Sequence, residues 1–342
     1  MSIYMKNQLN RAKFLICGGC GFMGSNFIRY LLKKCPEAEV VNLDLLTYAG
    51  NLSNLQGVPK SRYRFVKGDI CDSVLAVRLM EKADFVVNFA AETHVDRSIH
   101  GETGNFIKTN VLGVYSLLQA LRESPKVKKL VHISTDEVWG DLELHSRKKF
   151  DENSPFLPNS PYAASKAAGD LLIKSFVKTY KLPVIVSHSV NNFGPRQFPE
   201  KLIPFFTIRA LQNLALPLYG DGKNIRDWIF VDDHSEAIRL LLEKSEGGGI
   251  YAIAREDEHS NLEIAKRILS ILKKPSKLIT FVADRPGHDR RYSVNAAKIR
   301  QLGWKPRHSL DAKLEETVRW YKEHPKWWKE IFDKRRDINK HI

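Results

Sequence analysis

The stretch Lys13–Gly24 reads KFLICGGCGFMG and decides the fold. Its first five residues are mostly apolar, as in a strand buried inside a sheet, and the residues from Ser25 to Lys34 have the pattern of a helix. Glycine recurs at every third position of the loop between them, at Gly18, Gly21 and Gly24. Glycine lets the backbone turn tightly and approach a pyrophosphate, and the N-terminus of the following helix supplies N–H donors for that anion. The stretch therefore predicts the phosphate-binding part of a dinucleotide site.

Later strand ends extend this predicted pocket. Val40–Asp44 (VVNLD) reads as the next strand, and Asp44 ends it roughly 20 residues after the loop. Its carboxylate can accept hydrogen bonds from the adenosine ribose and would repel a 2′-phosphate, and no arginine follows it, so NAD is favoured over NADP. Asp69-Ile70 can cover the adenine, and the small pair Ala90-Ala91 allows a close approach of the cofactor.

Strands and helices alternate through the first half of the chain. We expect strands at Lys13–Cys17, Val40–Asp44, Tyr63–Lys67, Phe85–Ala90, Lys129–Ser134 and Pro183–Ser187, and helices at Ser25–Lys34, Val74–Glu81, Thr109–Glu123 and Ala163–Tyr180. Such alternation, with continuously apolar strands, predicts an α/β fold: a doubly wound, Rossmann-type parallel sheet with helices on both faces. Prolines interrupt the chain beyond about residue 190 and predict a smaller C-terminal α/β lobe. Asp227–Val231 and Asp232–Leu242 read as a strand and helix that return to the main sheet.

Composition excludes several classes of protein. The chain has 342 residues, of which 43% are hydrophobic and 27% charged, so it is neither disordered nor a collagen-like fibre nor a disulfide scaffold. No apolar stretch approaches the ~20 residues that span a bilayer, and the N-terminal MSIYMKNQLNR is not expected to be a signal peptide. The four cysteines lie in the first quarter; Cys17 and Cys20 have CxxC spacing without a second ligand pair, so we expect no metal and a reducing, cytoplasmic compartment.

The net charge of +15 suggests an anionic partner. Lysines and arginines are scattered along the chain without a continuous basic and aromatic element, so we expect neither a nucleic acid nor a membrane as partner. A single phosphorylated ligand, which the glycine loop also predicts, remains the favoured partner.

Two motifs can carry chemistry. Tyr162 and Lys166 form a YxxxK pair on one helix face. We expect the lysine ammonium and a positive nicotinamide to lower the pKa of the phenol. The tyrosine can then take a proton from a sugar hydroxyl.

Thr135, Asp136 and Glu137 stand at the end of a buried strand. An adjacent acid and base are what an elimination requires, since one removes a proton and the other protonates the leaving hydroxyl. The plainer interpretations are a chance YxxxK and a solvated turn with a helix cap.

The whole pattern resembles the dTDP-glucose 4,6-dehydratases of the extended short-chain dehydrogenase/reductase superfamily over about residues 12–325. The motifs that carry the resemblance are LTYAGN (46–51), AAETHVDRSI (90–99), STDEVWG (134–140), SPYAASKAA (160–168), NNFGPRQFPEKLIP (191–204), YGDGKNIRDWIFVDDH (219–234) and DRPGHDRRY (284–292). The resemblance implies that Tyr162, Lys166 and Thr135 serve oxidation at C4 of the sugar, that Glu137 removes the C5 proton and that Asp136 protonates the departing C6 hydroxyl.

The resemblance also implies the binding residues. Cofactor contacts are implied at Gly18, Gly21, Phe22, Met23, Gly24, Asp44, Leu45, Thr47, Asp69, Ile70, Phe89, Ala90, Ala91, Thr109, Tyr162, Lys166 and Asn192. Substrate contacts are implied at Thr93, Thr135, Asn191, Lys201, Leu202, Pro217, Leu218, Tyr219, Arg226, Asn261, Asp284, Arg285, Pro286, Gly287 and His288. The chain departs from the family pattern at several positions: Trp139 and Phe193 replace tyrosine, Cys17 and Cys20 replace threonine and alanine, Leu45 replaces lysine, and His188-Ser189-Val190 replaces arginine, cysteine and serine.

Domain limits and alternatives complete the predictions. We expect residues 1–189 to bind NAD, with 226–244 returning to this domain, residues 190–225 and 245–330 to form the substrate lobe, and 331–342 to be a basic tail. Family members usually dimerise through two long helices, for which Thr109–Glu123 and Ala163–Tyr180 are the candidates here. A 4-epimerase, a 4,6-dehydratase of another sugar nucleotide such as UDP-glucose, and a non-catalytic NAD-binding scaffold remain alternatives.

Overall fold

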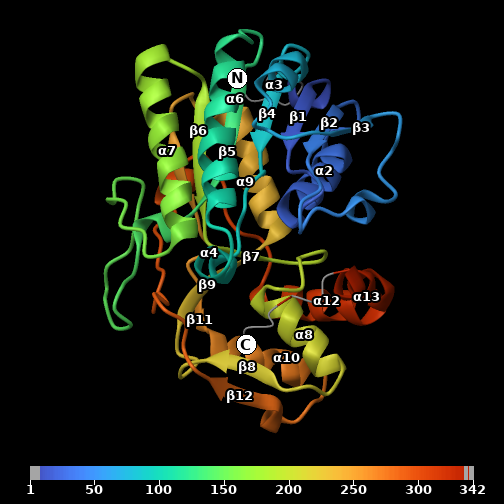
Figure 1. The fold of residues 1–342 in the computed structure, drawn as a ribbon, viewed down its shortest axis with the longest axis vertical. Helices are drawn as coiled ribbons and strands as arrows, with labels where there is room; N and C mark the ends of the chain where they lie inside the picture. The colour runs from blue at the N-terminus through green and yellow to red at the C-terminus, as the bar shows by residue number, and fades with distance from the viewer. Residues whose placement is uncertain (1–7, 335–337, 339–342) are drawn as a thin grey trace.

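Seven parallel strands form the main sheet of the computed structural model, which describes residues 8–334 and 338. The strand order is β10-β6-β5-β4-β1-β2-β3, and β1 stands near the centre (Figure 1). The strands are β1 (Lys13–Cys17), β2 (Glu39–Asp44), β3 (Tyr63–Lys67), β4 (Phe85–Asn88), β5 (Lys129–Thr135), β6 (Val184–Ser189) and β10 (Ile250–Ile253). The predicted α/β sheet is confirmed.

Helices cover both faces of this sheet. α2 (Phe22–Lys34) and α9 (Val231–Lys244) pack on one face, while α3 (Ser73–Met80), α6 (Val114–Arg122) and α7 (Pro161–Tyr180) pack on the other. Strand β1 shows why both faces are apolar. Phe14 and Ile16 point into the first layer, whereas Leu15 and Cys17 point into the second. Two buried layers require a continuously apolar strand, as its sequence has.

A second lobe lies at the carboxyl ends of the main strands (Figure 1). β7 (Asn191–Phe193), β9 (Ile225–Phe230) and β11 (Glu258–Ser260) form one small sheet, and β8 (Leu216–Tyr219) pairs with β12 (Ile279–Val282). The helices of this part are α8 (Leu202–Leu211), α10 (Asn261–Ile271), α11 (Ala297–Gln301), α12 (Leu310–Glu323) and α13 (Pro325–Lys334). Phe205, Leu218 and Ile264 belong to its separate apolar core.

Three segments differ from the predicted elements. The predicted strand at Asp227–Val231 lies in β9, which pairs with β7 and β11 rather than with the main sheet, although α9 does pack on the main domain. β10, from within 245–330, joins the main sheet beside β6. The single helix expected over Thr109–Glu123 is instead α5 (Gly104–Ile107), a π-helical segment over Lys108–Gly113 and then α6.

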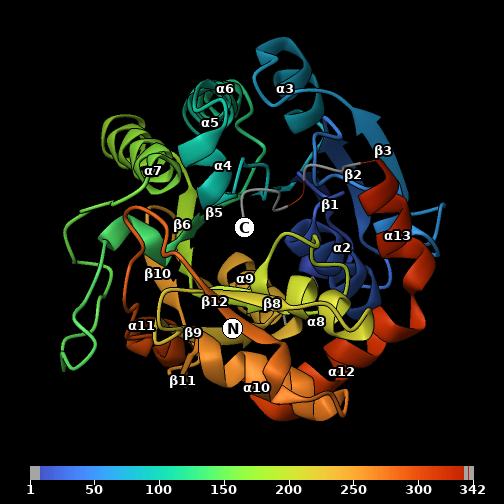
Figure 2. The same cartoon turned by 60° about the horizontal axis from the view of Figure 1, so that its bottom comes forward.

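The C-terminal helices pack through aromatic side chains. Tyr321 donates a hydrogen bond to the carbonyl oxygen of Gln197 (2.6 Å), and the Trp327 indole donates to Asn54 (2.9 Å). Figure 2 shows α13 beside the part of the main domain that holds α2 and β3. Of the predicted basic tail, residues 335–337 and 339–342 lie outside the described residues. Within the described part of the chain, no helix has the length and apolar character needed to cross a membrane.

Candidate active site

A cavity of about 280 Å³ opens where the main strands end. It collects side chains from segments spread between the glycine loop and Lys201. All predicted cofactor residues line it, and so do four of the five predicted catalytic residues: Thr135, Glu137, Tyr162 and Lys166. Thr93, Asn191 and Lys201 represent the predicted substrate contacts there. A second cavity, between α2, α9 and α12, contains none of the candidates.

Two glycines of the loop have no room for a side chain. Gly18 has φ +75°, and a Cβ there would lie 2.5 Å from the backbone nitrogen of Ala90. A Cβ on Gly24 would lie 2.4 Å from the carbonyl oxygen of Gly18. Gly21 is less crowded, since its Cβ would meet only Gly18 at 3.4 Å. The first and third glycines therefore permit the tight turn, and the middle position leaves open space over the N-terminus of α2 for an anion.

Asp44 is fixed at the end of β2 by backbone amides. Its Oδ2 accepts a hydrogen bond from the Cys20 amide and its Oδ1 from the Leu46 amide, both at 2.8 Å. Burial raises the pKa of Asp44, and these two hydrogen bonds lower it. The chain also uses Asn42, which sequence reasoning missed: its Oδ1 accepts from the Gly19 amide at 3.0 Å. A polar residue inside the apolar strand VVNLD was the available signal.

Helix α7 carries the YxxxK pair into the cavity. Ser160 caps the helix by accepting a hydrogen bond from the Ala163 amide, and Tyr162 and Lys166 are both buried. In the protein alone, burial and the charge of Glu137 raise the pKa of Tyr162 well above its usual range, so the lowering that we expect from the ammonium and the nicotinamide together stays a prediction. Lys166 Nζ donates a hydrogen bond to the carbonyl oxygen of Ile133 at 2.7 Å.

The acidic pair follows directly after β5. Thr135 Oγ1 accepts a hydrogen bond from the Glu137 amide, so the expected cap is present, and Thr135 also donates to Asp136 Oδ1 (both 3.3 Å). Asp136 is buried, and its Oδ2 has no hydrogen-bond partner among residues 8–334 and 338. Burial, and then the charge of Glu137, raise the Asp136 pKa well above its usual range. Asp136 is therefore suited to hold a proton.

Glu137 differs from its neighbour in what surrounds it. It lines the cavity, and burial raises its pKa. The cations of Arg285 and Lys201 oppose this rise. The pKa of both carboxyl groups is raised, that of Asp136 further, while nearby cations favour the charged form of Glu137. Two adjacent carboxyl groups in such different surroundings can serve as an acid and a base.

The other predicted substrate residues lie on the second lobe, outside the lining of the 280 Å³ cavity. Leu202 and Asn261 are the first residues of α8 and α10, and Pro217–Tyr219 lie in β8. Arg226 is buried over the Tyr292 ring (4.1 Å) and donates to the carbonyl oxygen of Asp289. In the loop 284–288, Asp284 pairs with His288 at 2.6 Å. The His288 ring packs edge-on against Tyr219 with centroids 5.8 Å apart.

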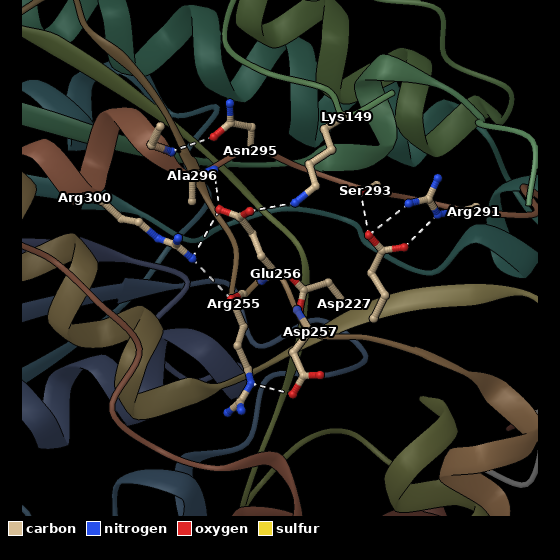
Figure 3. A network of polar contacts seen from close by, with 12 residues as sticks. Lys149, Asp227, Arg255, Glu256, Asp257, Arg291, Ser293, Asn295, Ala296 and Arg300 are labelled. Carbon is tan, nitrogen blue, oxygen red and sulfur yellow. Dashed lines mark hydrogen bonds and ion pairs between the residues drawn. The ribbon is translucent and has the colours of Figure 1, made fainter. Parts of the chain in front are cut away.

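A polar network braces the strand that bears Arg226 (Figure 3). Asp227, the next residue of β9, accepts a hydrogen bond from the Glu256 amide at 2.7 Å. The Glu256 carboxylate in turn binds Lys149 (2.7 Å) and Arg300 (3.2 Å). Glu256 has φ +65°, a backbone conformation that costs free energy in a residue with a side chain and is held here by these contacts. The network thus joins β9 to three distant segments.

The cavity also contains residues to which sequence reasoning gave no role. Tyr48 donates a hydrogen bond to Glu200 at 2.9 Å, and burial raises the pKa of Glu200 to about 7. Both residues lie inside motifs that carried the resemblance, LTYAGN and NNFGPRQFPEKLIP. Their separation by 152 residues kept their contact out of reach of local patterns.

Comparisons with known proteins agree on one family. Residues 15–317 match the family model described as GDP-mannose 4,6 dehydratase. The dTDP-glucose 4,6-dehydratase of Neisseria meningitidis serogroup B is 44% identical over 344 residues, covering 94% of this chain and 96% of that protein. The low-salt glycan biosynthesis protein Agl12 of Haloferax volcanii is 47% identical over 308 residues, covering 90% and 97%. The crystal structure of DesIV, a dTDP-glucose 4,6-dehydratase from Streptomyces venezuelae with NAD and TYD bound, has a TM-score of 0.90 at 45% identity and covers 93% of this chain and 99% of that one.

Proposed function

The chain belongs to the GDP-mannose 4,6 dehydratase family, and we propose that within it the protein is a hydro-lyase that converts dTDP-glucose to dTDP-4-keto-6-deoxyglucose and water. The observation that carries this proposal is the pair Asp136 and Glu137. A buried carboxyl group suited to hold a proton stands beside a carboxylate that faces the cavity. This pair supplies the acid and the base of an elimination.

The proposed cofactor is NAD. Gly18, Gly21 and Gly24 would hold its pyrophosphate over the N-terminus of α2, and Asp44 would hold the adenosine ribose. NAD bound there would supply hydride transfer: oxidation at C4 of the sugar and reduction at C6. The charge of an oxidised nicotinamide would favour the Tyr162 phenolate, which the protein alone disfavours.

The chain's own residues would move the protons. Tyr162 takes the proton of the C4 hydroxyl while the Thr135 hydroxyl polarises the oxygen that becomes the ketone. Glu137 then removes the C5 proton, which the new ketone has made acidic. Asp136 protonates O6, the C6–O6 bond breaks and water leaves. Glu137 returns its proton to C5. Tyr162 releases the proton that it took from O4, and Asp136 takes up one proton in place of the one that it gave to O6. The three residues are then restored, and the substrate has lost one water with no net oxidation.

Charged residues of the second lobe would hold the diphosphate. Arg226 and Arg285 carry guanidinium groups, which bind phosphate oxygens in a bidentate way. Lys201 Nζ, which donates to the Thr93 carbonyl oxygen at 3.0 Å, stands at the cavity between the two lobes. The remaining second-lobe contacts stay proposals of the same kind, with Pro217–Tyr219 lining the nucleotide.

A 4-epimerase is the main competing function. Epimerisation needs oxidation and reduction at C4 alone, for which Tyr162, Lys166 and Thr135 suffice. It gives no role to a base for C5 or to an acid for O6. The pair Asp136 and Glu137 therefore favours dehydration.

Product analysis tests the proposal directly. The purified protein is incubated separately with dTDP-glucose and UDP-glucose, and the products are followed by the alkaline absorbance of the 4-keto sugar and by mass. We expect the loss of one water from dTDP-glucose. A 4-epimer without any 4-keto-6-deoxy product would favour the epimerase, and unchanged sugar nucleotides in both incubations would contradict both functions.

We further propose a homodimer in a reducing, cytoplasmic compartment. Helices α6 and α7 and the π-helical segment before α6 expose Leu112, Tyr115 and Leu171 (55%, 44% and 55% exposed), an apolar surface that a second copy can cover. Light scattering tests the dimer, which Leu171→Asp should weaken.

All four cysteines are free thiols, which fits the proposed reducing compartment. We also propose that residues 1–189, with α9 (Val231–Lys244) and β10, bind the cofactor, while the remainder of 190–330 binds the sugar nucleotide.

A further inference from the structure

A buried carboxylate lies behind the YxxxK pair. Tyr162, Lys166 and Asp170 follow one another at intervals of four residues, which places them on one face of α7. Asp170 is only 4% exposed. Its Oδ2 accepts a hydrogen bond from Ser134 Oγ at 2.6 Å and lies 2.9 Å from His188 Nε2. The function proposed above leaves this residue without a role.

His132 stands between Asp170 and Lys166. Its Nε2 lies 3.2 Å from Lys166 Nζ and 3.8 Å from Asp170 Oδ1. The other ring nitrogen, Nδ1, lies 3.1 Å from the side-chain nitrogen of Asn88. The Asn88 oxygen accepts from the Ala90 amide at 3.1 Å, which fixes the orientation of the Asn88 amide. Asn88 therefore donates to His132 Nδ1, and the proton of the neutral ring is on Nε2.

With this tautomer, the hydrogen bonds around Lys166 Nζ do not by themselves favour the ammonium over the neutral amine. The His132 Nε2–H faces Lys166 Nζ, so a hydrogen bond between them needs the neutral amine as acceptor, whereas the Ile133 carbonyl oxygen accepts from either form. Burial lowers the pKa of Lys166 to about 8, and the charge of Asp170 opposes that fall. The neighbouring imidazole cannot carry the positive charge in place of Lys166, because burial lowers the pKa of His132 to about 3.

We propose that Asp170 is a positioning residue of the active site, which supplies from the core side of α7 the negative charge that keeps Lys166 an ammonium. The proposal rests on the function proposed above, in which Tyr162 is the base for the C4 hydroxyl. A positive Lys166, four residues further along α7, would favour the phenolate together with the nicotinamide. Asp170 acts through Lys166 and touches neither substrate nor cofactor. Ser134 and His188 hold its carboxylate in place.

His188, which contacts Asp170, lies in the run His188-Ser189-Val190 that departs from the family pattern given above. His188 itself stands where arginine is usual. Its ring packs against Trp139 with centroids 4.7 Å apart, and Trp139 is another of these departures. The groups that face Asp170 are thus Ser134 and His132 from β5, Lys166 from α7 and His188 from β6. No arginine belongs to this set, so the negative charge stays available to Lys166.

The test measures the ionisation of Lys166 in the NAD-loaded protein. The wild type and Asp170→Asn are prepared with lysine that carries ¹³C at Cε, and the ¹³C chemical shift of Lys166, assigned with Lys166→Arg, is followed across a pH series. We expect the midpoint to be lower by about one pH unit or more in the variant than in the wild type, because the charge of Asp170 raises the pKa of Lys166 and losing an opposite charge shifts a pKa by that order. The alkaline limb of the kcat profile should move in the same direction.

Matched variants separate this effect from loss of structure. Asp233→Asn neutralises another buried carboxylate, which accepts the Arg307 and His308 amides away from the cavity, and it should leave the Lys166 midpoint unchanged. Asp170→Ser removes the charge with a smaller side chain, should Asp170→Asn not fold. An unchanged midpoint in the Asp170 variants, with activity reduced equally at every pH, would overturn the proposal. The measurement of the Lys166 midpoint needs no turnover. Absence of the 4-keto product in the wild type would therefore count against the proposed function alone.

Discussion

Arg285 NH1 lies 3.1 Å from Asp96 Oδ1, and this ion pair joins the second lobe to the main domain beside the candidate active site. Both side chains are largely buried, at 16% and 6% exposure. Burial raises the pKa of Glu137, the proposed C5 base, and the Arg285 charge opposes this rise. One arginine therefore connects the substrate lobe, the main domain and the acid–base pair.

Asp96→Asn should weaken substrate binding more than turnover. Arg285 would lose the carboxylate that orients it toward the proposed diphosphate site, and we expect KM for dTDP-glucose to rise roughly tenfold, which corresponds to about 1.4 kcal/mol. Steady-state kinetics measures the change. Asp221→Asn is the matched control, because it breaks an exposed ion pair with Arg290 (3.0 Å), and exposed pairs contribute little. Equal KM values in the two variants would contradict this role of Arg285.

Glu137→Gln should separate oxidation from elimination. The amide keeps the shape of the side chain but cannot take the C5 proton, so we expect product formation to fall by about 10²- to 10⁴-fold. Rapid-mixing absorbance at the reduced nicotinamide band should still show oxidation at C4. Product formation close to the wild-type rate would assign the C5 base to another residue.

Gly18→Ala should remove the cofactor. The added Cβ would meet the Ala90 backbone at 2.5 Å, and backbone cannot yield as a flexible side chain can. We expect NAD bound per protomer, measured after denaturation, to fall at least roughly tenfold. Gly57→Ala is the control: Gly57 has φ +84° but nothing within 4 Å of the added Cβ. It should cost about 1–2 kcal/mol of stability from its backbone conformation and leave the NAD content unchanged.

Asp227 should make the fold less stable as pH rises. Burial raises its pKa to about 7 from 3.8, so the folded state binds more protons than the unfolded state between these values. The free energy of unfolding then falls with rising pH across this window, by up to about 1.4 kcal/mol per pH unit. Denaturant unfolding of Asp227→Asn should show a shallower decline between pH 5 and 7 than the wild type. Parallel curves would contradict the assignment.

Local sequence patterns predicted those parts of the fold that are determined within one short segment. KFLIC and its glycine loop specify a buried strand and a tight turn within twelve residues, and the structure has both at the predicted positions. The pairing of β10 with β6, and of β9 with β7, depends on contacts between distant segments, which apolar runs do not encode. The π-helical segment before α6 could not be predicted either, because its apolar residues have the spacing of an ordinary helix.

Sequence motifs predicted which residues line the site, but not the contacts that these residues make with distant segments. The cofactor candidates do gather around one cavity, because strand ends of a parallel sheet meet at one edge. The direction of Lys166 was not predictable, since it depends on Ile133, His132 and Asp170 behind it. The raised pKa of Tyr162 likewise comes from burial and from Glu137, which lies 25 residues earlier in the sequence.

The place of β10 in the main sheet has a consequence for synthesis on the ribosome. Strand β6 ends at Ser189, but the strand that covers its edge begins only at Ile250. At about 5–20 residues per second, the growing chain holds that edge unpaired for several seconds. Open strand edges recruit other chains, so slow translation between these strands should promote aggregation of the nascent protein. For the same reason, a fragment that ends at residue 189 would keep this edge permanently uncovered.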